Sequence, residues 1–165
     1  TVTTTIRIDM KSGILAIVAI VAVSFLIIEP SQPVAAGTIK WFGYEEGMIR
    51  AKADKKKVFL NFHAEWCTYC TKMNKETFTN SGIIAYLNDN FIPIKVDVDR
   101  EKVVAGKYKV KGLPTTSFLN ADGEDIGSQP GFIPANSMMS ILKYIHTDSY
   151  KTMSMKDFLK KIHEP

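Results

Sequence analysis

The chain of 165 residues has the length of one domain, and its 45% hydrophobic and 23% charged residues are typical of a globular protein. Its formal net charge of +4 is spread along the sequence, and its short lysine run, residues 55–57, adjoins a predicted strand. We interpret that run as a solvated edge and expect no nucleic-acid partner. Having only two cysteines, the chain is not a disulfide-rich scaffold.

The N-terminal part is predicted to lie outside the fold. Residues 14–28 form an apolar run with basic residues before it and small residues, ending at Ala36, after it, which is typical of a secretory signal peptide. As a helix the run would span roughly 22 Å, less than the ~30 Å hydrocarbon core, which favours cleavage over an uncleaved membrane anchor. In both interpretations, residues 1–36 form a separate N-terminal part, which is either a signal peptide or a membrane anchor together with a linker. Both also place the domain, residues 37–165, in the periplasm or another extracytoplasmic space, with membrane contact only through the N-terminal segment.

The rest of the chain alternates between helix-like and strand-like segments. Charged stretches rich in good helix formers predict helices, and short apolar or alternating runs predict strands. In the last segment, Met155, Phe158, Leu159 and Ile162 fall on one helical face, which we interpret as core packing. This alternation predicts an α/β domain with at least one parallel crossover. Helices are expected at residues 44–56, 67–77, 83–87, 100–108, 135–145 and 153–162, and strands at 58–63, 91–98, 116–119 and 125–128.

Cys67 and Cys70 follow a predicted strand and begin a predicted helix. This spacing puts the two sulfur atoms within about one helical turn, close enough to form a disulfide. Free backbone N–H groups and the helix dipole favour a thiolate at the helix start, so we expect a lowered pKa at Cys67 and a nucleophilic role for it. Cys70 is expected to be more buried, and to resolve a mixed disulfide by attacking Cys67.

A Cys-x-x-Cys pair also occurs as half of a zinc site or as a structural disulfide. Zinc would need two more ligands, and the chain has no further cysteine, so we expect no metal. A disulfide across so few residues constrains the unfolded chain little, which makes a purely structural role a weak alternative. No glycine-rich phosphate loop is present, so no cofactor beyond the redox-active cysteine pair is expected.

Two motifs together carry a family resemblance. Residues 64–70 (AEWCTYC), behind an apolar strand, and residues 112–115 (GLPT) far downstream resemble the thioredoxin superfamily. Residues 61–78 and 96–99 (VDVD) are most similar to exported thioredoxin-like proteins related to the C-terminal domain of the thiol:disulfide interchange reductases. The resemblance implies a thioredoxin fold, with a central mixed sheet flanked by helices, and disulfide exchange as the activity.

The resemblance also implies the surroundings of the cysteine pair. Pro114 would follow a cis peptide bond in a loop that faces the cysteines and offers backbone groups to a bound peptide. Trp66 would cap the site as a contact surface, with a position in the core as the alternative. The two residues between the cysteines tune the redox potential in such proteins. The expected supporting and groove residues are Trp66, Thr68, Tyr69, Leu113, Pro114 and Thr115.

The sequence departs from the family pattern at two positions. The family often places a buried acid in the strand before the cysteines, where this chain has Asn61, and the interchange reductases carry an acid where it has Asn74. Neither amide can act as a general base, so another group has to accept the proton of Cys70. Glu65 is the first candidate, with Glu76 or a water molecule as alternatives, and His63 is the second candidate. The possible proton-relay residues are Glu65, His63 and Asn61, the last because it occupies the position of the family's acid.

The expected function is a thiol:disulfide oxidoreductase that reduces disulfides of exported proteins. Its partners would be protein thiols and disulfides, with a membrane protein as upstream electron donor. The Thr68–Tyr69 dipeptide differs from the Gly-Pro of thioredoxin, so an oxidase or isomerase of the same fold is an alternative. A non-catalytic module that binds a partner in the groove of Trp66 and Pro114, or a metal-handling protein, is the alternative outside enzymes.

Overall fold

The structure, a computed structural model, describes residues 37–163. The apolar run at residues 14–28 and the expected boundary after Ala36 lie outside the described residues. Within residues 37–163, no helix is both long enough and apolar enough to cross a membrane.

The elements follow the predicted order, with ends that differ by a few residues. Strands and helices alternate through the first two thirds of the described chain, and helices dominate its end. The helices are α2 (Tyr44–Asp54), α3 (Thr68–Glu76), α4 (Ser81–Asn90), α5 (Lys102–Lys107), α6 (Ala135–His146), the 3-10 helix η2 (Ser149–Lys151) and α7 (Met155–His163). The strands are β1 (Lys57–His63), β2 (Phe91–Asp97), β3 (Thr115–Leu119) and β4 (Asp125–Pro130).

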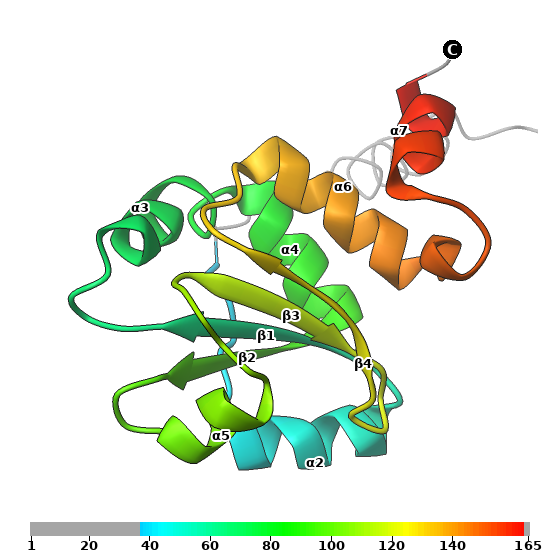
Figure 1. Cartoon of the computed structure of the whole chain (residues 1–165). Helices are drawn as coiled ribbons and strands as arrows, with labels where there is room; N and C mark the ends of the chain where they lie inside the picture. The colour runs from blue at the N-terminus through cyan, green and yellow to red at the C-terminus, as the bar shows by residue number, and fades with distance from the viewer. Residues whose placement is uncertain (1–36, 164–165) are drawn as a thin grey trace, which may run out of the picture. The chain divides into compact units, whose positions relative to one another are not determined.

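The four strands form one mixed sheet in the order β2-β1-β3-β4. β1 pairs parallel to β2 and antiparallel to β3, and β3 pairs antiparallel to β4. The parallel pair confirms the predicted crossover, and the sheet with helices on both faces confirms the expected thioredoxin fold. Figure 1 shows α4 and α6 on one face of the sheet and α2 and α5 on the other. β1 is therefore covered on both faces, which explains why its sequence reads as a nearly continuous apolar run.

The core consists of two layers, one on each face of the sheet. On the α4 and α6 face, the ring of Phe59 packs against the rings of Trp41, Phe78 and Phe118 at centroid distances of 5.7–6.0 Å. On the other face, Leu60 and Phe62 are buried beneath α2 and α5. The alternation along β1 thus assigns odd-numbered residues to the α4 and α6 face.

A glycine lets α2 approach this second face closely. A Cβ atom at Gly47 would clash with the side chain of Ile94 in β2, so any larger residue would push the helix away from the sheet. The packing of α2 therefore depends on the absence of a side chain at this position.

The predicted apolar face of the last helix is only partly buried. Phe158 is buried and its ring lies 5.3 Å from that of Tyr144 in α6. Ile162, predicted to pack in the core, is 43% exposed. The reason is that α7 packs chiefly against one helix, α6, which covers only part of its apolar face. The helical periodicity of the sequence shows that such a face exists but not how much of it is buried.

Candidate active site

Cys67 lies at the end of the segment that leaves β1 and is the N-cap of α3, as the motif predicts. Its sulfur atom forms a disulfide with Cys70, whose Cα lies 5.2 Å from that of Cys67. The backbone N–H of Cys70 also donates a hydrogen bond of 3.1 Å to Cys67 Sγ. The same N–H also donates to the carbonyl of Cys67 at 3.1 Å, so the two acceptors share it. An N–H group at a helix start favours negative charge on the sulfur that it faces, so this geometry favours a thiolate at Cys67 in the reduced protein.

The two cysteines are buried alike in the disulfide form, at 5% and 4% exposed for Cys67 and Cys70. The expected difference in burial is therefore absent from this state. Because the bond joins both sulfur atoms in one small apolar cluster with Ala64, each is shielded to the same degree.

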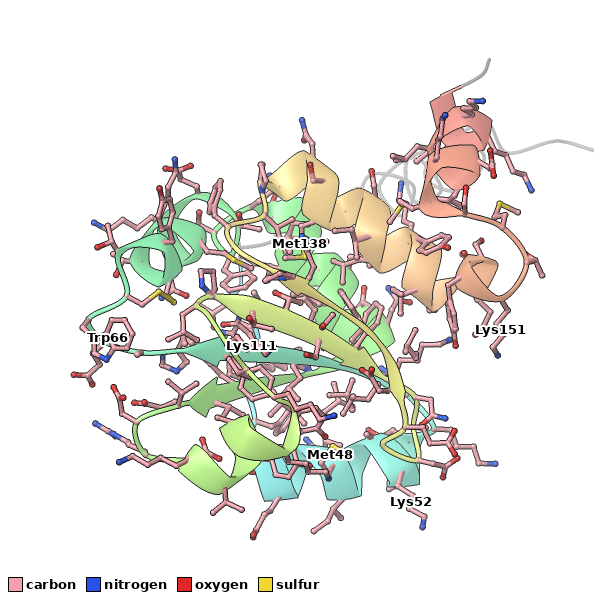
Figure 2. All side chains as sticks on the ribbon, viewed as in Figure 1. Met48, Lys52, Trp66, Lys111, Met138 and Lys151 are labelled. Carbon is pink, nitrogen blue, oxygen red and sulfur yellow. A yellow bond between two sulfur atoms is a disulfide. The ribbon has the colours of Figure 1, made fainter. Side chains whose placement is uncertain are left out.

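Two aromatic side chains stand exposed beside this buried disulfide. Trp66 is 70% and Tyr69 62% exposed, so a core position for Trp66 is wrong. The indole Nε1 of Trp66 donates a hydrogen bond of 2.8 Å to Asp99 Oδ2. This bond holds the ring of Trp66, which is labelled in Figure 2, at the surface beside α3. Sequence reasoning did not assign a role to Asp99, although it lies in the VDVD segment that carries the family resemblance. The structure therefore exposes two large aromatic side chains directly beside the buried disulfide.

The loop before β3 reaches the cysteines. The peptide bond between Leu113 and Pro114 is cis, as expected. Leu113 packs against the cluster of Ala64, Cys67 and Cys70. The carbonyl of Pro114 accepts a 2.7 Å hydrogen bond from the N–H of Gly131, which ties the loop to the end of β4.

Thr115, expected to line the groove, is buried. Its hydroxyl donates a hydrogen bond of 2.7 Å to the carbonyl of Gly112, so it closes the loop on itself. Thr68, the first residue between the cysteines, begins α3 and is exposed.

The three relay candidates occupy different environments. Glu65, the first candidate, is 81% exposed in its side chain and forms an ion pair of 3.4 Å with Arg100. An exposed, ion-paired carboxylate is poorly placed to exchange a proton with a buried thiol. His63 is half-buried, and its pKa is lowered mainly by burial and further by the charge of Lys95. Asn61 is 2% exposed, and its Nδ2 has no hydrogen-bond partner within the described structure.

Asn61 belongs to a polar layer that lies further along β1 than Phe59. In the register of the sheet it is opposite Lys95 of β2 and opposite Thr116 of β3. Thr116 is fully buried, and within residues 37–163 its hydroxyl also lacks a partner. Lys95 reaches α3, where its Nζ donates a hydrogen bond of 3.3 Å to Asn74 Oδ1.

Sequence reasoning missed Lys95. The alternating pattern of residues 91–98 assigned it to the polar set, and α3 covers that set only in the folded structure. The sequence pattern offered no signal for this contact, because the burial of Pro93 on the same side is itself known only from the folded structure.

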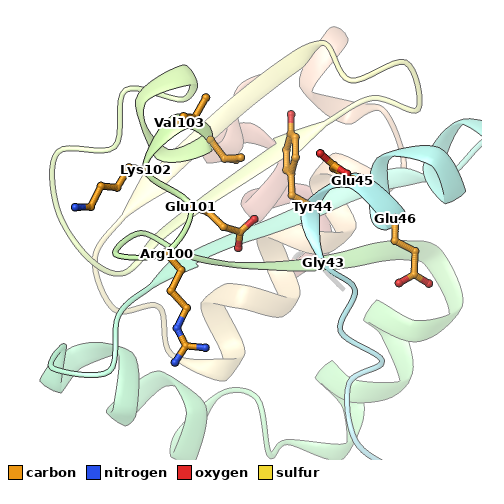
Figure 3. A pocket seen from close by; sticks show the side chains of 9 residues that line it. Gly43, Tyr44, Glu45, Glu46, Arg100, Glu101, Lys102 and Val103 are labelled. Atoms are coloured by element: carbon orange, nitrogen blue, oxygen red, sulfur yellow. The ribbon is translucent and has the colours of Figure 1, made fainter.

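A separate pocket lies at the starts of α2 and α5. Figure 3 shows Tyr44, Glu101 and Val103 around it, with Arg100 at its border. Arg100 also pairs with Glu65 and Asp97, so the pocket adjoins the loop that braces Trp66 without containing either cysteine. Residues 37–163 hold no group of three or more His, Cys, Asp or Glu side chains that could bind a metal ion.

Comparisons with known proteins agree on one family. A family described as "Thioredoxin-like domain" matches residues 44–146. The solved thioredoxin of Thermus thermophilus is similar to this chain with a TM-score of 0.61 and 30% identity, covering 66% of this chain and 88% of that one.

Two curated relatives are named for disulfide chemistry. The disulfide bond reductase DsbH of Chlamydia pneumoniae is 24% identical over 128 residues, which are 70% of this chain and 76% of the relative. The thiol:disulfide interchange protein DsbD of Vibrio vulnificus is 30% identical over 107 residues, or 61% of this chain. The chain spans only 18% of DsbD, so the likeness concerns one part of that larger protein.

Proposed function

Because this chain belongs to the thioredoxin-like domain family and is a thiol:disulfide oxidoreductase, we propose that it reduces disulfide bonds in exported proteins. The observation that carries the proposal is the buried disulfide at the start of α3, beside two exposed aromatic residues and the cis-proline loop. A partner chain bound across this surface would bring its own disulfide to Cys67.

The reaction proceeds in two exchanges. In the reduced protein, the Cys67 thiolate attacks one sulfur of the partner's disulfide, which breaks that bond and forms a mixed disulfide. Cys70 then loses its proton and attacks Cys67 Sγ, which releases the partner as a dithiol. Two electrons pass to the partner, and the pair is left as the Cys67–Cys70 disulfide of the structure.

The direction of electron flow and the location rest on relatives and on the N-terminal sequence. DsbH carries the name of a reductase, which supports reduction over oxidation, whereas the name of DsbD supports thiol:disulfide exchange without a direction. Each turnover consumes two electrons, so a donor has to reduce Cys67–Cys70 again. The apolar run at residues 14–28 supports an extracytoplasmic domain, for which a membrane protein is the fitting donor.

Turnover with a defined protein disulfide tests this proposal. The full chain is mixed with insulin, with dithiothreitol as the electron source, and cleavage of the insulin disulfides is followed. The wild type should accelerate cleavage, and Cys67→Ser should lose that acceleration. Cys70→Ser should accumulate a mixed disulfide with insulin that mass spectrometry detects. Full activity in Cys67→Ser would contradict the proposal.

The reduction potential of the pair tests the direction separately. A value near ~−270 mV supports a reductase, and one near ~−120 mV indicates an oxidant of folding proteins. Buffers of glutathione or dithiothreitol with known poise give this value from the fraction of oxidised protein.

A further inference from the structure

The last helix, α7, leaves part of its apolar face uncovered. Phe158, at one side of that face, is buried against α6, whereas Ile162 is 43% exposed. Between α6 and α7 lies a groove of about 830 Å³, whose apolar lining consists of Ile141 from α6 and of Met155 and Leu159 from α7. Small polar residues of α6 complete the lining. No element of residues 37–163 fills this groove.

Lysines accompany the apolar face of α7 on both sides. Lys156 and Lys160 are one helical turn apart, and both line the groove beside its apolar residues. Lys161 lies on the other side of the apolar face, and all three lysines are exposed. Residues 149–165 hold four lysines against two acids. An apolar helix face between basic flanks is typical of helices that lie in the interface of a membrane.

The nearest acids are engaged elsewhere. Asp157 caps the start of α7, where it accepts a hydrogen bond of 2.6 Å from the Ser154 hydroxyl and donates its own N–H to that hydroxyl oxygen at 3.2 Å. Asp148 pairs with Lys57 and Lys151. Within residues 37–163, none of the three lysines of α7 forms an ion pair. The groove therefore combines an apolar lining with positive charge that is not neutralised by a partner in the described structure.

We propose that α7 and its groove dock the domain on the anionic phospholipids of a membrane surface. Acyl chains and phosphate groups meet at that surface, which matches the adjacent rows of apolar and basic side chains. The nine residues of α7 make a helix ~14 Å long, less than half of the ~30 Å hydrocarbon core, so α7 would lie in the interface and not cross the bilayer. This contact is additional to the N-terminal one expected from the sequence, and it does not depend on the reductase activity.

A second copy of the chain would fit this surface less well. A contact with two-fold symmetry brings the same patch of both copies together, so the lysines of one α7 would face those of the other. Like charges placed together across an interface are unfavourable. An anionic membrane surface instead offers each lysine a counter-charge, which strengthens binding roughly fivefold for each lysine close to the surface.

Docking through α7 would leave the disulfide open to substrates. Figure 1 shows α7 beyond α6, on the side away from α3, and Figure 2 shows Trp66 and Lys151 at opposite sides of the molecule. Cys67 at the start of α3 would therefore face away from the bilayer. A domain docked in this way stays at the membrane while its redox pair remains accessible to proteins in the aqueous compartment.

Hydrogen exchange of α7 in the full chain tests the proposal. The protein is mixed with vesicles of phosphatidylcholine alone, or of equal parts of phosphatidylcholine and phosphatidylglycerol. Mass spectrometry then follows exchange in peptides from residues 153–163 and, for comparison, residues 44–54. The amides of α7 should exchange more slowly with the anionic vesicles than with the neutral ones, and those of α2 should not distinguish them. Because the readout is local, attachment through residues 14–28 would not imitate this result.

Matched variants separate the charge of the groove from charge in general. In the double variant Lys156→Gln with Lys160→Gln, the ratio of docked to free α7, which sets the slowing, should fall about twenty-five-fold, as should occur for two lysines at such a surface. Ile162→Ser should lower the ratio severalfold, because less apolar area enters the interface. The control is Lys52→Gln with Lys102→Gln, which removes two exposed lysines from α2 and α5 and should keep the slowing of the wild type.

The possible outcomes distinguish this inference from its alternatives and from the proposed function. Equal exchange of α7 with both kinds of vesicle would overturn it, as would slowing that persists in Lys156→Gln with Lys160→Gln. Slowing that grows with protein concentration in the absence of lipid would show that a second copy covers the groove instead. Insulin reduction by the same samples is a separate readout. If the wild type reduces insulin and α7 does not respond to anionic lipid, the docking is wrong and the reductase stands, whereas the reverse result leaves the docking and removes the reductase.

Discussion

The side chains near the two ends of β1 differ in whether they find partners within the domain. Where the strand begins, Lys57 donates to the carbonyl of His146 and pairs with Asp148 at 3.2 Å, and Lys151 pairs with the same carboxylate at 3.0 Å. Where the strand leads to the disulfide, Trp66 is exposed to solvent, and the buried Nδ2 of Asn61 has no hydrogen-bond partner among residues 37–163. At the first end, the charged side chains pair with one another within the domain. At the second end, an aromatic side chain is exposed beside the disulfide, where a substrate protein could bind.

This contrast predicts that Trp66→Ala has the largest effect, and that the effect is on activity. Loss of one central aromatic contact should lower kcat/KM for insulin reduction about tenfold. The free energy of unfolding should change little, because the side chain is 70% exposed. Kinetics and chemical denaturation of the same samples measure both. Ile49→Ala, also at an exposed apolar residue, is the control. An unchanged kcat/KM in Trp66→Ala would show that Trp66 does not contact the substrate.

At the opposite end, Asp148→Asn should affect stability alone. The free energy of unfolding should fall by at most about 1 kcal/mol, as for other surface ion pairs, with kcat/KM unchanged. Asparagine is the suitable replacement because Asp148 has a φ of 57°, which asparagine tolerates. Denaturant titrations at low and high salt check the loss, which should shrink as salt screens the pairs. A changed kcat/KM would show that the two ends are coupled.

The pH dependence of this loss has a definite sign. The pKa of Asp148 is lowered, first by the hydrogen bond from Lys151, against the opposing effect of burial, and further by Lys57. A lowered pKa in the folded state means that the stabilisation is present above the unfolded value of 3.8 and is lost as the pH falls through the folded value. The wild type and Asp148→Asn should therefore converge in acid.

The smallest expected effect comes from His63, the last residue of β1 before the disulfide. Its pKa is lowered from 6.5, mainly by burial, so the folded state disfavours the protonated ring. Between the folded and unfolded pKa values the unfolded chain binds more protons, and the wild type should lose stability as the pH falls below 6.5. His63→Gln should lack this decline. Free energies of unfolding across this range measure it, and parallel curves for the two proteins would refute it.

The sequence predicted the elements and the dithiol because both depend on neighbouring residues. The apolar run of β1, the Cys-x-x-Cys spacing and the proline loop are local signals, and each predicted element lies within a few residues of its expected place, whereas the short helix η2 was not predicted. Exposure of Trp66 also followed from the family resemblance.

The surroundings of Cys70 depend on contacts between distant residues and could not be predicted in the same way. The contact of Lys95 with Asn74 needs the β1–β2 register and the packing of α3 together. Likewise, Glu65 became the first relay candidate because it is close to Cys67 in sequence. In the structure it is exposed and pairs with Arg100, which lies 35 residues away.

The short segment before α2 has a consequence for self-association. Phe42 bridges to Ile94, and its backbone exchanges hydrogen bonds with Pro93 and Lys95 along the outer edge of β2. At the opposite edge, β4 ends in Pro130, which has no N–H to donate, and its pairing with β3 is irregular near Phe118. Within the described residues, neither edge offers an unbroken ladder to a foreign strand. The sheet of the described residues is thus protected at both edges against extension by a strand of another molecule, which disfavours aggregation along it.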